Sequence, residues 1–405
     1  MMMENKNVRP WQQYQALYLH IPFCVQKCLY CDFASYAGFG EQAKRDYTDA
    51  VCKEIALRAP EAANMAANAS IYFGGGTPSV LPTECIAKLV NALKQYGFWQ
   101  QPCEATIEVN PGTADLAKLQ TLRSLGFDRI SFGVQSLHDD ELRAIGRIHN
   151  AQQALEALTL ARKAGFARVS ADLIYGLPSQ TLASLQDTLE RLADTGIEHI
   201  SVYGLIVEEG TPLASLVDKG RITLPDEDAA ADMYELVQDF LRKRGYERYE
   251  ISNYAKNGQY SRHNTVYWEY HPYIAFGAAA CGFDGQRRRT GLSTVREYIE
   301  QLKSFSCGDL RTSALYNSAL YNIEELSCAE LLEEFMFMGL RRSEGASLAE
   351  ARKRFDVDVL QRFASELAPL FEQKLIAYDA STQRLRLTER GMEVGNQIFE
   401  VFVIT

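Results

Sequence analysis

Long hydrophobic runs are missing from this sequence. No stretch offers about 18 consecutive apolar residues, which excludes a transmembrane helix. Residues 1–14 lack the apolar core of a signal peptide, and they are too polar and too poor in arginine for a transit peptide. We therefore expect a cytoplasmic protein.

An excess of positive charge is also missing. The 42 Lys and Arg residues are outnumbered by 52 Asp and Glu, which gives a net charge of -10. Such a chain repels nucleic acid and anionic lipid at long range, so neither is expected as a primary partner. The content of 47% hydrophobic residues is that of a folded globular protein, and 405 residues favour a large domain with a smaller one.

A disulfide framework is not expected, because the nine cysteines are an odd number in a chain without an export signal. Three of them, Cys24, Cys28 and Cys31, lie within eight residues of each other. Five others lie scattered in helical or strand patterns and are predicted to be small packed thiols. These are Cys52, Cys85, Cys103, Cys307 and Cys328.

Short β-rich runs alternate with helix-patterned segments over the first half of the chain. The predicted strands are 16–21, 70–73, 105–109, 129–132, 168–174 and 199–205. The predicted helices are 41–58, 83–96, 114–125, 151–164 and 182–193. This order predicts an α/β fold with a parallel sheet, either open and doubly wound or an incomplete barrel. In both, ligands lie beyond the carboxyl ends of the strands.

Unusual polar motifs fall at those strand ends. The cysteine triplet follows the first strand, GGGTP (74–78) the second, EVNP (108–111) closes the third, SFGVQS (131–136) the fourth, and DLIYGLP (172–178) the fifth. After about residue 210 the alternation stops, and we expect an aromatic-rich covering region over 211–326. The pattern over residues 327–405 predicts three helices (330–341, 348–355 and 359–371), a hairpin (375–388) and a last helix that begins at Gly391. This order is typical of a winged-helix-like domain. A nucleic-acid role for it is disfavoured by the acidic chain.

The spacing C-x3-C-x2-C brings three thiolates together in a loop. A zinc ion would need a fourth ligand, and nearby His20 is expected to point away from the loop because it lies in the strand pattern. Three thiolates instead leave one iron of a cubane cluster open to an external ligand.

The run YLHIPFC (18–24), through Cys28 and Cys31, resembles the signature of radical S-adenosylmethionine (SAM) proteins in the coproporphyrinogen dehydrogenase-like branch. The strand-end motifs, with GRIH (146–149) and YEISNYA (249–255), follow in that branch's order. The resemblance implies a partial (β/α)6 radical-SAM barrel over 1–210 and a [4Fe-4S] cluster on Cys24, Cys28 and Cys31. It also implies S-adenosyl-L-methionine as a cofactor, and the residues expected to bind it are Tyr18, Gly75, Gly76, Thr77, Glu108, Gln135, Arg147 and Asp172. The glycines would let backbone donors approach this ligand closely.

Within the branch, two features resemble the HemW group of heme chaperones. Phe33 stands where coproporphyrinogen dehydrogenases carry a further cysteine, and HNTVYW (263–268) matches the HNxxYW motif linked to heme binding. The resemblance implies heme as a ligand, with the imidazole of His263 as a candidate axial ligand and His271, His149 and Cys281 as alternatives. Cys281 itself replaces an expected histidine, and alanines stand where glycines are expected at Ala275 and Ala279.

The function implied is that of a heme chaperone, which binds heme and transfers it to an apo-hemoprotein, with a respiratory protein as one candidate recipient and a homodimer as the expected assembly. A radical SAM enzyme that abstracts hydrogen from a tetrapyrrole, as in coproporphyrinogen III dehydrogenase, is the alternative, so enzymatic turnover stays open. A second alternative is a zinc- or iron-stabilised interaction module that uses the C-terminal domain.

Overall fold

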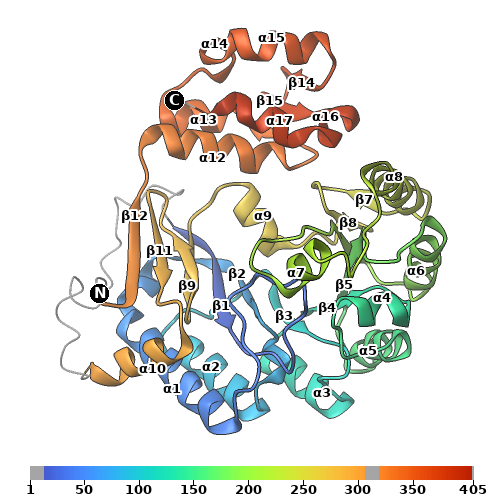
Figure 1. Cartoon of the computed structure of the whole chain (residues 1–405). Coiled ribbons are helices and arrows are strands. Elements are labelled where there is room, and N and C mark those ends of the chain that lie inside the picture. Colours follow the sequence, from blue (N-terminus) through green and yellow to red (C-terminus); the bar gives the residue numbers. More distant parts are fainter. Residues whose placement is uncertain (1–12, 306–318, 404–405) are drawn as a thin grey trace.

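The computed structural model describes residues 13–305 and 319–403. Residues 1–12 of the N-terminal segment and Cys307 lie outside the described residues. Within them, the fold is a curved, open sheet of strands with helices on its outer side and a small separate layer above it (Figure 1).

All six predicted strands are present, and they pair in parallel in chain order, as in a partial (β/α)6 barrel. The strands are β1 (Tyr14–Ile21), β2 (Met65–Gly75), β3 (Ala105–Val109), β4 (Arg129–Gln135), β5 (Arg168–Tyr175) and β6 (His199–Gly204). The helices between them are α1 (Glu41–Leu57), α2 (Thr83–Gln95), α3 (Leu116–Leu125), α4 (Asp139–Ala144), α5 (Ala151–Lys163) and α6 (Leu182–Asp194). The predicted fold class is therefore confirmed.

The region after residue 210 adds strands to both edges of this sheet, where the sequence led us to expect an irregular cover. Beyond β6 lie β8 (Asn253–Ala255) and β7 (Glu247–Arg248). Beyond β1 lie β9 (Tyr273–Phe276), which pairs in parallel with β1, and the antiparallel strands β10 (Cys281–Phe283), β11 (Arg287–Gly291) and β12 (Tyr321–Glu325). Its helices are α7 (Pro212–Asp218), α8 (Glu227–Lys243), α9 (Arg262–Trp268) and α10 (Val295–Ser304).

Strand β1 shows why this sheet forms. Its residues Leu17, Leu19 and Ile21 are fully buried in the main core, and period-two alternation turns Tyr18 and His20 toward the opposite face. The carbonyl of His20 accepts a 2.9 Å hydrogen bond from the buried Tyr47 hydroxyl of α1. This fixes the strand against the outer helix just before the cysteine loop begins.

The C-terminal residues form their own core and a three-stranded sheet. The elements are α12 (Cys328–Leu340), β13 (Ala346–Ser347), α13 (Leu348–Phe355), α14 (Val359–Arg362), α15 (Ala364–Glu372), β14 (Ile376–Asp379), β15 (Arg384–Leu387), α16 (Glu389–Glu393) and α17 (Gly395–Phe399). Helix α12 begins with a capping box, in which Ser327 and Glu330 exchange hydrogen bonds with each other's backbone N–H groups. The predicted hairpin is present, whereas the predicted helix 359–371 breaks at Phe363.

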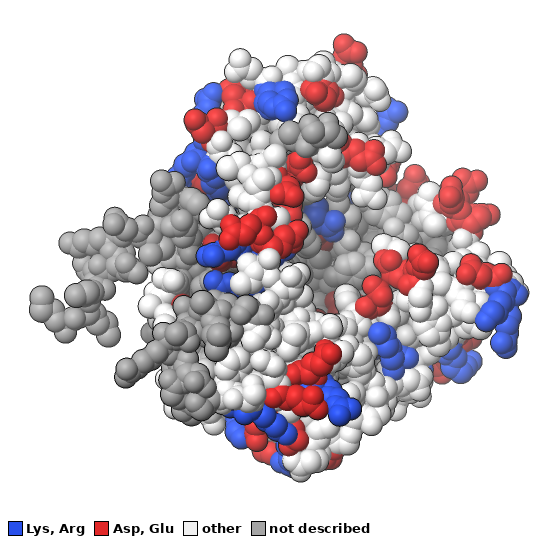
Figure 2. Space-filling view, turned by 60° about the vertical axis from the view of Figure 1, so that its left-hand side comes forward, with Lys and Arg blue, Asp and Glu red and all other residues white. Residues whose placement is uncertain are grey.

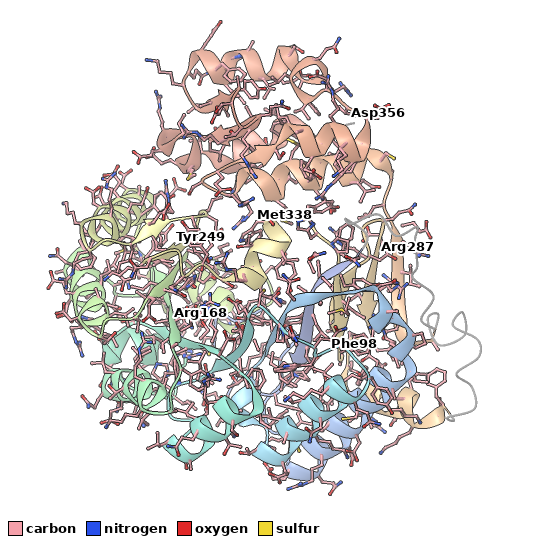
Figure 3. All side chains as sticks on the ribbon, turned by 180° about the vertical axis from the view of Figure 1, so that it is seen from behind. Phe98, Arg168, Tyr249, Arg287, Met338 and Asp356 are labelled. Carbon is pink, nitrogen blue, oxygen red and sulfur yellow. The ribbon has the colours of Figure 1, made fainter. Side chains whose placement is uncertain are left out.

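Helix α9 lies between the barrel and the C-terminal domain, in contact with α12 (Figure 1). From behind, Met338 of α12 lies at the side of the C-terminal domain that faces α9 (Figure 3). Acidic and basic side chains are interspersed over the face drawn in Figure 2, which does not favour nucleic acid as a partner. Among the residues described, no helix combines the length and the apolar character needed to cross a bilayer.

Candidate metal and cofactor site

The loop that carries the three cysteines is held by backbone hydrogen bonds, one within the loop and one to the residue that follows α4. The Cys24 N–H donates to the Tyr36 carbonyl at 2.9 Å, and the Leu29 N–H donates to the Ile145 carbonyl at 3.0 Å. Cys24, Cys28 and Cys31 are all partly exposed free thiols that line one cavity of about 140 Å³. They therefore face a common space, as the spacing predicted.

Each sulfur atom already has a weak polar neighbour. Thr77 Oγ1 donates to Cys24 Sγ at 3.6 Å, Arg147 Nη1 donates to Cys28 Sγ at 3.4 Å, and Cys31 Sγ lies 3.7 Å from Ser35 Oγ. Burial raises the pKa of Cys24. Among the described residues, no three His, Cys, Asp or Glu side chains are arranged to hold a single metal ion, whereas in a cubane cluster each cysteine binds a different iron atom.

His20 does not point away from the loop, and our expectation was wrong on this point. Its Nε2 donates to the Ala34 carbonyl of the loop at 2.9 Å, and its Nδ1 accepts from the Tyr18 hydroxyl at 3.0 Å. Both ring nitrogens are therefore used within the protein, which removes His20 as a fourth zinc ligand. Tyr18 lies behind the cavity wall in the same chain of contacts, and its predicted role at SAM stays a prediction.

The glycine run at the end of β2 is needed for close packing. Gly75 has a φ of 112°, and a Cβ on it would lie 2.4 Å from the His20 ring; one on Gly76 would lie 2.8 Å from the Phe23 carbonyl. We expected the backbone N–H groups of this segment to be free to approach a ligand, but they already have partners within the protein. The Gly75 N–H donates to Glu108 Oε2, the Gly76 N–H to the Ile21 carbonyl and the Thr77 N–H to the Phe23 carbonyl. All three residues still line the cavity.

Two half-buried carboxyl groups, those of Glu108 and Asp172, also line this cavity. Glu108 accepts a 2.6 Å hydrogen bond from the Tyr72 hydroxyl, and burial raises its pKa to about 7 against the lowering effect of that bond. Burial likewise raises the pKa of Asp172, which accepts from Ser131 Oγ at 3.3 Å. Carboxyl groups in this setting suit an ammonium group or ribose hydroxyls.

Gln135 and Arg147 complete the predicted set. Gln135 ends β4 with a φ of 67°, where the strand register shifts, and it lines the cavity with 9% of its surface exposed. Arg147 donates to Asn110 Oδ1 at 2.8 Å and to the Gly133 carbonyl. Its guanidinium group thus lies between the cysteine loop and the end of β4. Apart from Tyr18, the cavity brings together every SAM residue predicted from the sequence.

A second cavity, of about 420 Å³, opens from the first and shares Cys31, Phe33 and both carboxyl groups with it. Phe33 and Ile206 stand at its edge, with 70% and 68% of their surfaces exposed. Asn264 of the HNxxYW segment also lines it.

His263 is buried, with 1% of its surface exposed. Its Nδ1 lies 3.0 Å from Ser70 Oγ and its Nε2 lies 2.8 Å from the Tyr267 hydroxyl, while its ring stacks on Tyr72 at 4.8 Å. Burial lowers its pKa to about 3. Heme ligation by His263 stays a prediction, and it would require one of these hydrogen bonds to break.

The other candidate iron ligands lie apart from each other. Buried His149 has its Nε2 3.1 Å from the Val134 carbonyl, and burial together with Arg147 lowers its pKa to about 4. Cys281 is half-buried in β10. His271 lines a third cavity, between the barrel and the C-terminal domain.

Sequence reasoning did not identify Tyr72, Asn110 or Ser131 as parts of the site. Nothing in the sequence marks Tyr72 as more than an ordinary β-strand residue. Side-chain alternation nevertheless places it on the same face of β2 as Gly74, which opens the glycine motif. Asn110 and Ser131 belong to motifs that were recognised, yet their side-chain partners come from other strands, and such non-local contacts leave no trace in spacing.

Comparison with known proteins agrees with this geometry. A model of the radical SAM superfamily matches residues 18–192, and a model of the HemN C-terminal domain matches residues 326–394. The heme chaperone HemW of Lactococcus lactis is 33% identical over 97% of this chain and 98% of its own length, and that of Bacillus subtilis is 35% identical over 96% and 99%. The chain belongs to the HemW family of radical SAM proteins.

A solved structure of coproporphyrinogen III oxidase (HemN) from Escherichia coli covers 98% of this chain and 91% of its own, with a TM-score of 0.81 at 24% identity. That likeness supports the fold alone. The recognition and fold predictions are confirmed. Membership of the radical SAM superfamily implies a [4Fe-4S] cluster and SAM. This HemW-family site fits both, because three thiols face one cavity, beside two half-buried carboxyl groups and a guanidinium group.

Proposed function

We propose that this chain is a heme chaperone, which binds heme and transfers it to an apo-hemoprotein, with a cytoplasmic location and with a respiratory protein as one recipient. The observation that carries the proposal is the near full-length similarity to proteins named heme chaperone HemW, at 33% and 35% identity. Phe33 supports it, because coproporphyrinogen dehydrogenases are expected to carry a cysteine at that place.

In this proposal Cys24, Cys28 and Cys31 would hold the cluster. When bound, a reduced cluster supplies an electron to SAM. Arg147 Nη1 lies 3.4 Å from Cys28 Sγ and so places a positive charge beside the cysteine loop. Glu108 and Asp172 would receive the ammonium group and the ribose hydroxyls of SAM, and the hydrogen bonds from Tyr72 and Ser131 keep both carboxyl groups oriented.

The experiment that tests the function is heme transfer under anaerobic, reducing conditions. The cluster-reconstituted, heme-loaded chain is mixed with an apo-hemoprotein, and the absorption of the acceptor is followed while the tetrapyrrole is recovered and analysed. Acceptor loading with an unchanged tetrapyrrole supports the chaperone. A chemically altered tetrapyrrole, together with 5′-deoxyadenosine, would overturn it in favour of a radical SAM enzyme.

A further inference from the structure

One side chain of the cysteine cavity is hydrogen-bonded to the donors of two cysteine sulfur atoms. Asn110 of the EVNP motif follows β3, and it lines the cavity of about 140 Å³. Its Nδ2 donates to Thr77 Oγ1 at 2.9 Å, and its Oδ1 accepts from Arg147 Nη2 at 2.8 Å. Thr77 Oγ1 in turn donates to Cys24 Sγ, and Arg147 Nη1 donates to Cys28 Sγ. A single carboxamide group therefore joins the polar partners of two predicted cluster ligands.

The direction of these hydrogen bonds follows from the chemistry of the groups. A guanidinium group has only donors, so the atom of Asn110 that faces Arg147 must be the amide oxygen. The amide nitrogen then donates to Thr77, whose single hydroxyl proton is left for the sulfur of Cys24. The protons thus point one way, from the Arg147 cation through Asn110 to sulfur. Because hydrogen bonds in series polarise one another, the last donor of the series becomes more positive.

The backbone around Asn110 is fixed as well. Its carbonyl accepts from the Thr113 N–H at 3.1 Å and from the Thr113 hydroxyl at 2.6 Å. Pro111 follows, and a proline restricts the residue before it to extended conformations. On the other side of the amide, a Cβ on Gly133 would lie 3.1 Å from Asn110 Oδ1 and 3.0 Å from Arg147 Nη2. The missing side chain of Gly133 therefore leaves room for the amide and the guanidinium group to meet.

Donors beside the sulfur atoms matter most for the redox properties of an iron–sulfur cluster. Hydrogen bonds to the sulfurs, nearby charge and exposure to solvent together set its reduction potential. The reduced form carries one more negative charge than the oxidised form, so a donor or a cation beside the sulfurs stabilises it and raises the potential. The third sulfur, that of Cys31, lies 3.7 Å from Ser35 Oγ, where either atom can be the donor. The two donors of fixed direction are those that Asn110 holds.

We propose that Asn110 is a positioning residue for the cluster. It keeps the Thr77 hydroxyl and the Arg147 guanidinium group directed at two of the ligand sulfur atoms, and it thereby raises the reduction potential of a bound [4Fe-4S] cluster. The inference rests on the cluster site of the proposed function and deepens it. Asn110 has no hydrogen bond to a cysteine in the described part of the chain, so it acts through its two neighbours.

The test is an anaerobic redox titration of the cluster-reconstituted full chain without SAM, which follows the reduced cluster by electron paramagnetic resonance. We expect Asn110→Leu to shift the midpoint potential to a more negative value, because both donors lose their fixed partner. At one applied potential, the ratio of reduced to oxidised cluster should fall by roughly fivefold to tenfold. Asn110→Asp should shift it in the same direction, since a carboxylate cannot donate to Thr77 and adds a negative charge.

Two further variants separate this role from a general effect on the cavity. Asn264→Leu makes the same change at a residue that lines the neighbouring cavity and takes no part in this bridge, so it should keep the wild-type potential. Thr77→Val removes the hydroxyl group at one end of the bridge and should lower the potential. Because Asn110 acts partly through that hydroxyl, Asn110→Leu combined with Thr77→Val should give less than the sum of the two single shifts.

An unchanged or more positive potential in the Asn110 variants that hold a full cluster would overturn the inference while the cluster site stands. Additive shifts in the double variant, or an equal shift in Asn264→Leu, would overturn it as well. Loss of the cluster from both folded Asn110 variants would also do so, because Asn110 would then be needed to hold the cluster. Failure of the wild type to bind a cluster would instead overturn the site on which the inference rests.

Discussion

The Tyr72 hydroxyl donates a 2.6 Å hydrogen bond to Glu108, and the Tyr72 ring stacks on His263 at 4.8 Å. Through this pair of contacts, the helix that carries the HNxxYW segment touches the wall of the cysteine cavity. His263 of the HNxxYW motif is therefore packed inside the barrel.

Glu108 predicts a pH dependence of SAM binding. Because its pKa is raised to about 7, the carboxyl group is largely protonated below neutrality and ionises as the pH rises, which strengthens its attraction for the cationic ligand. We expect the ratio of wild-type to Glu108→Gln affinity for SAM to increase between pH 6 and pH 8. Calorimetric titration at several pH values measures it. A ratio independent of pH would contradict a role for Glu108 ionisation.

The same shift has a consequence for the stability of the ligand-free protein. A carboxyl group whose pKa is higher in the folded state than in the unfolded state binds more protons when folded, so stability falls as the pH rises from about 4.5 through 7. The full effect is about 3 kcal/mol. Urea midpoints should therefore fall more over this interval for the wild type than for Glu108→Gln. Parallel profiles would argue against the raised pKa.

Cluster assembly should depend on three thiols only. We expect Cys24→Ser, Cys28→Ser and Cys31→Ser each to lose most of the iron and acid-labile sulfide after anaerobic reconstitution, because each sulfur faces the shared cavity. Cys103→Ser and Cys328→Ser, which replace exposed thiols, are matched controls and should keep both. Retention of full iron and sulfide by any of the first three variants would exclude that residue as a ligand.

Ala279 adopts a left-handed backbone conformation with a φ of 58°, at a place where the family resemblance implies glycine. A side chain in this conformation costs about 1 kcal/mol. We expect Ala279→Gly to raise the free energy of unfolding by about that amount, measured by urea denaturation. Neighbouring Ala278→Gly, which relieves no such strain, should lower it. Destabilisation by both changes would contradict the account.

His263→Ala should act mainly on stability. It leaves the hydroxyl groups of Ser70 and Tyr267 without their partner in a buried site, at a cost of about 1–3 kcal/mol. Thermal unfolding should show a midpoint below that of the wild type. An unchanged midpoint would contradict the account of these two hydrogen bonds.

Much of this arrangement could be predicted from the sequence, for reasons visible in particular residues. Motifs that follow parallel strands must meet at one edge of the sheet, so the convergence of Cys24, Glu108 and Asp172 follows from βα order. The pairing of β9 with β1 joins segments that are far apart in the sequence, and no local sequence pattern predicts it. The orientation of His20 depends on a loop carbonyl at Ala34, and the cavity at His271 depends on where α12 and α13 pack. Such facts come from tertiary contacts alone.

The most direct test of the central claim is an anaerobic titration of the wild-type chain with heme. The account predicts saturable binding with one heme for each chain, and recovery of the heme chemically unchanged. Binding that never saturates, or conversion of the tetrapyrrole during the titration, would contradict it.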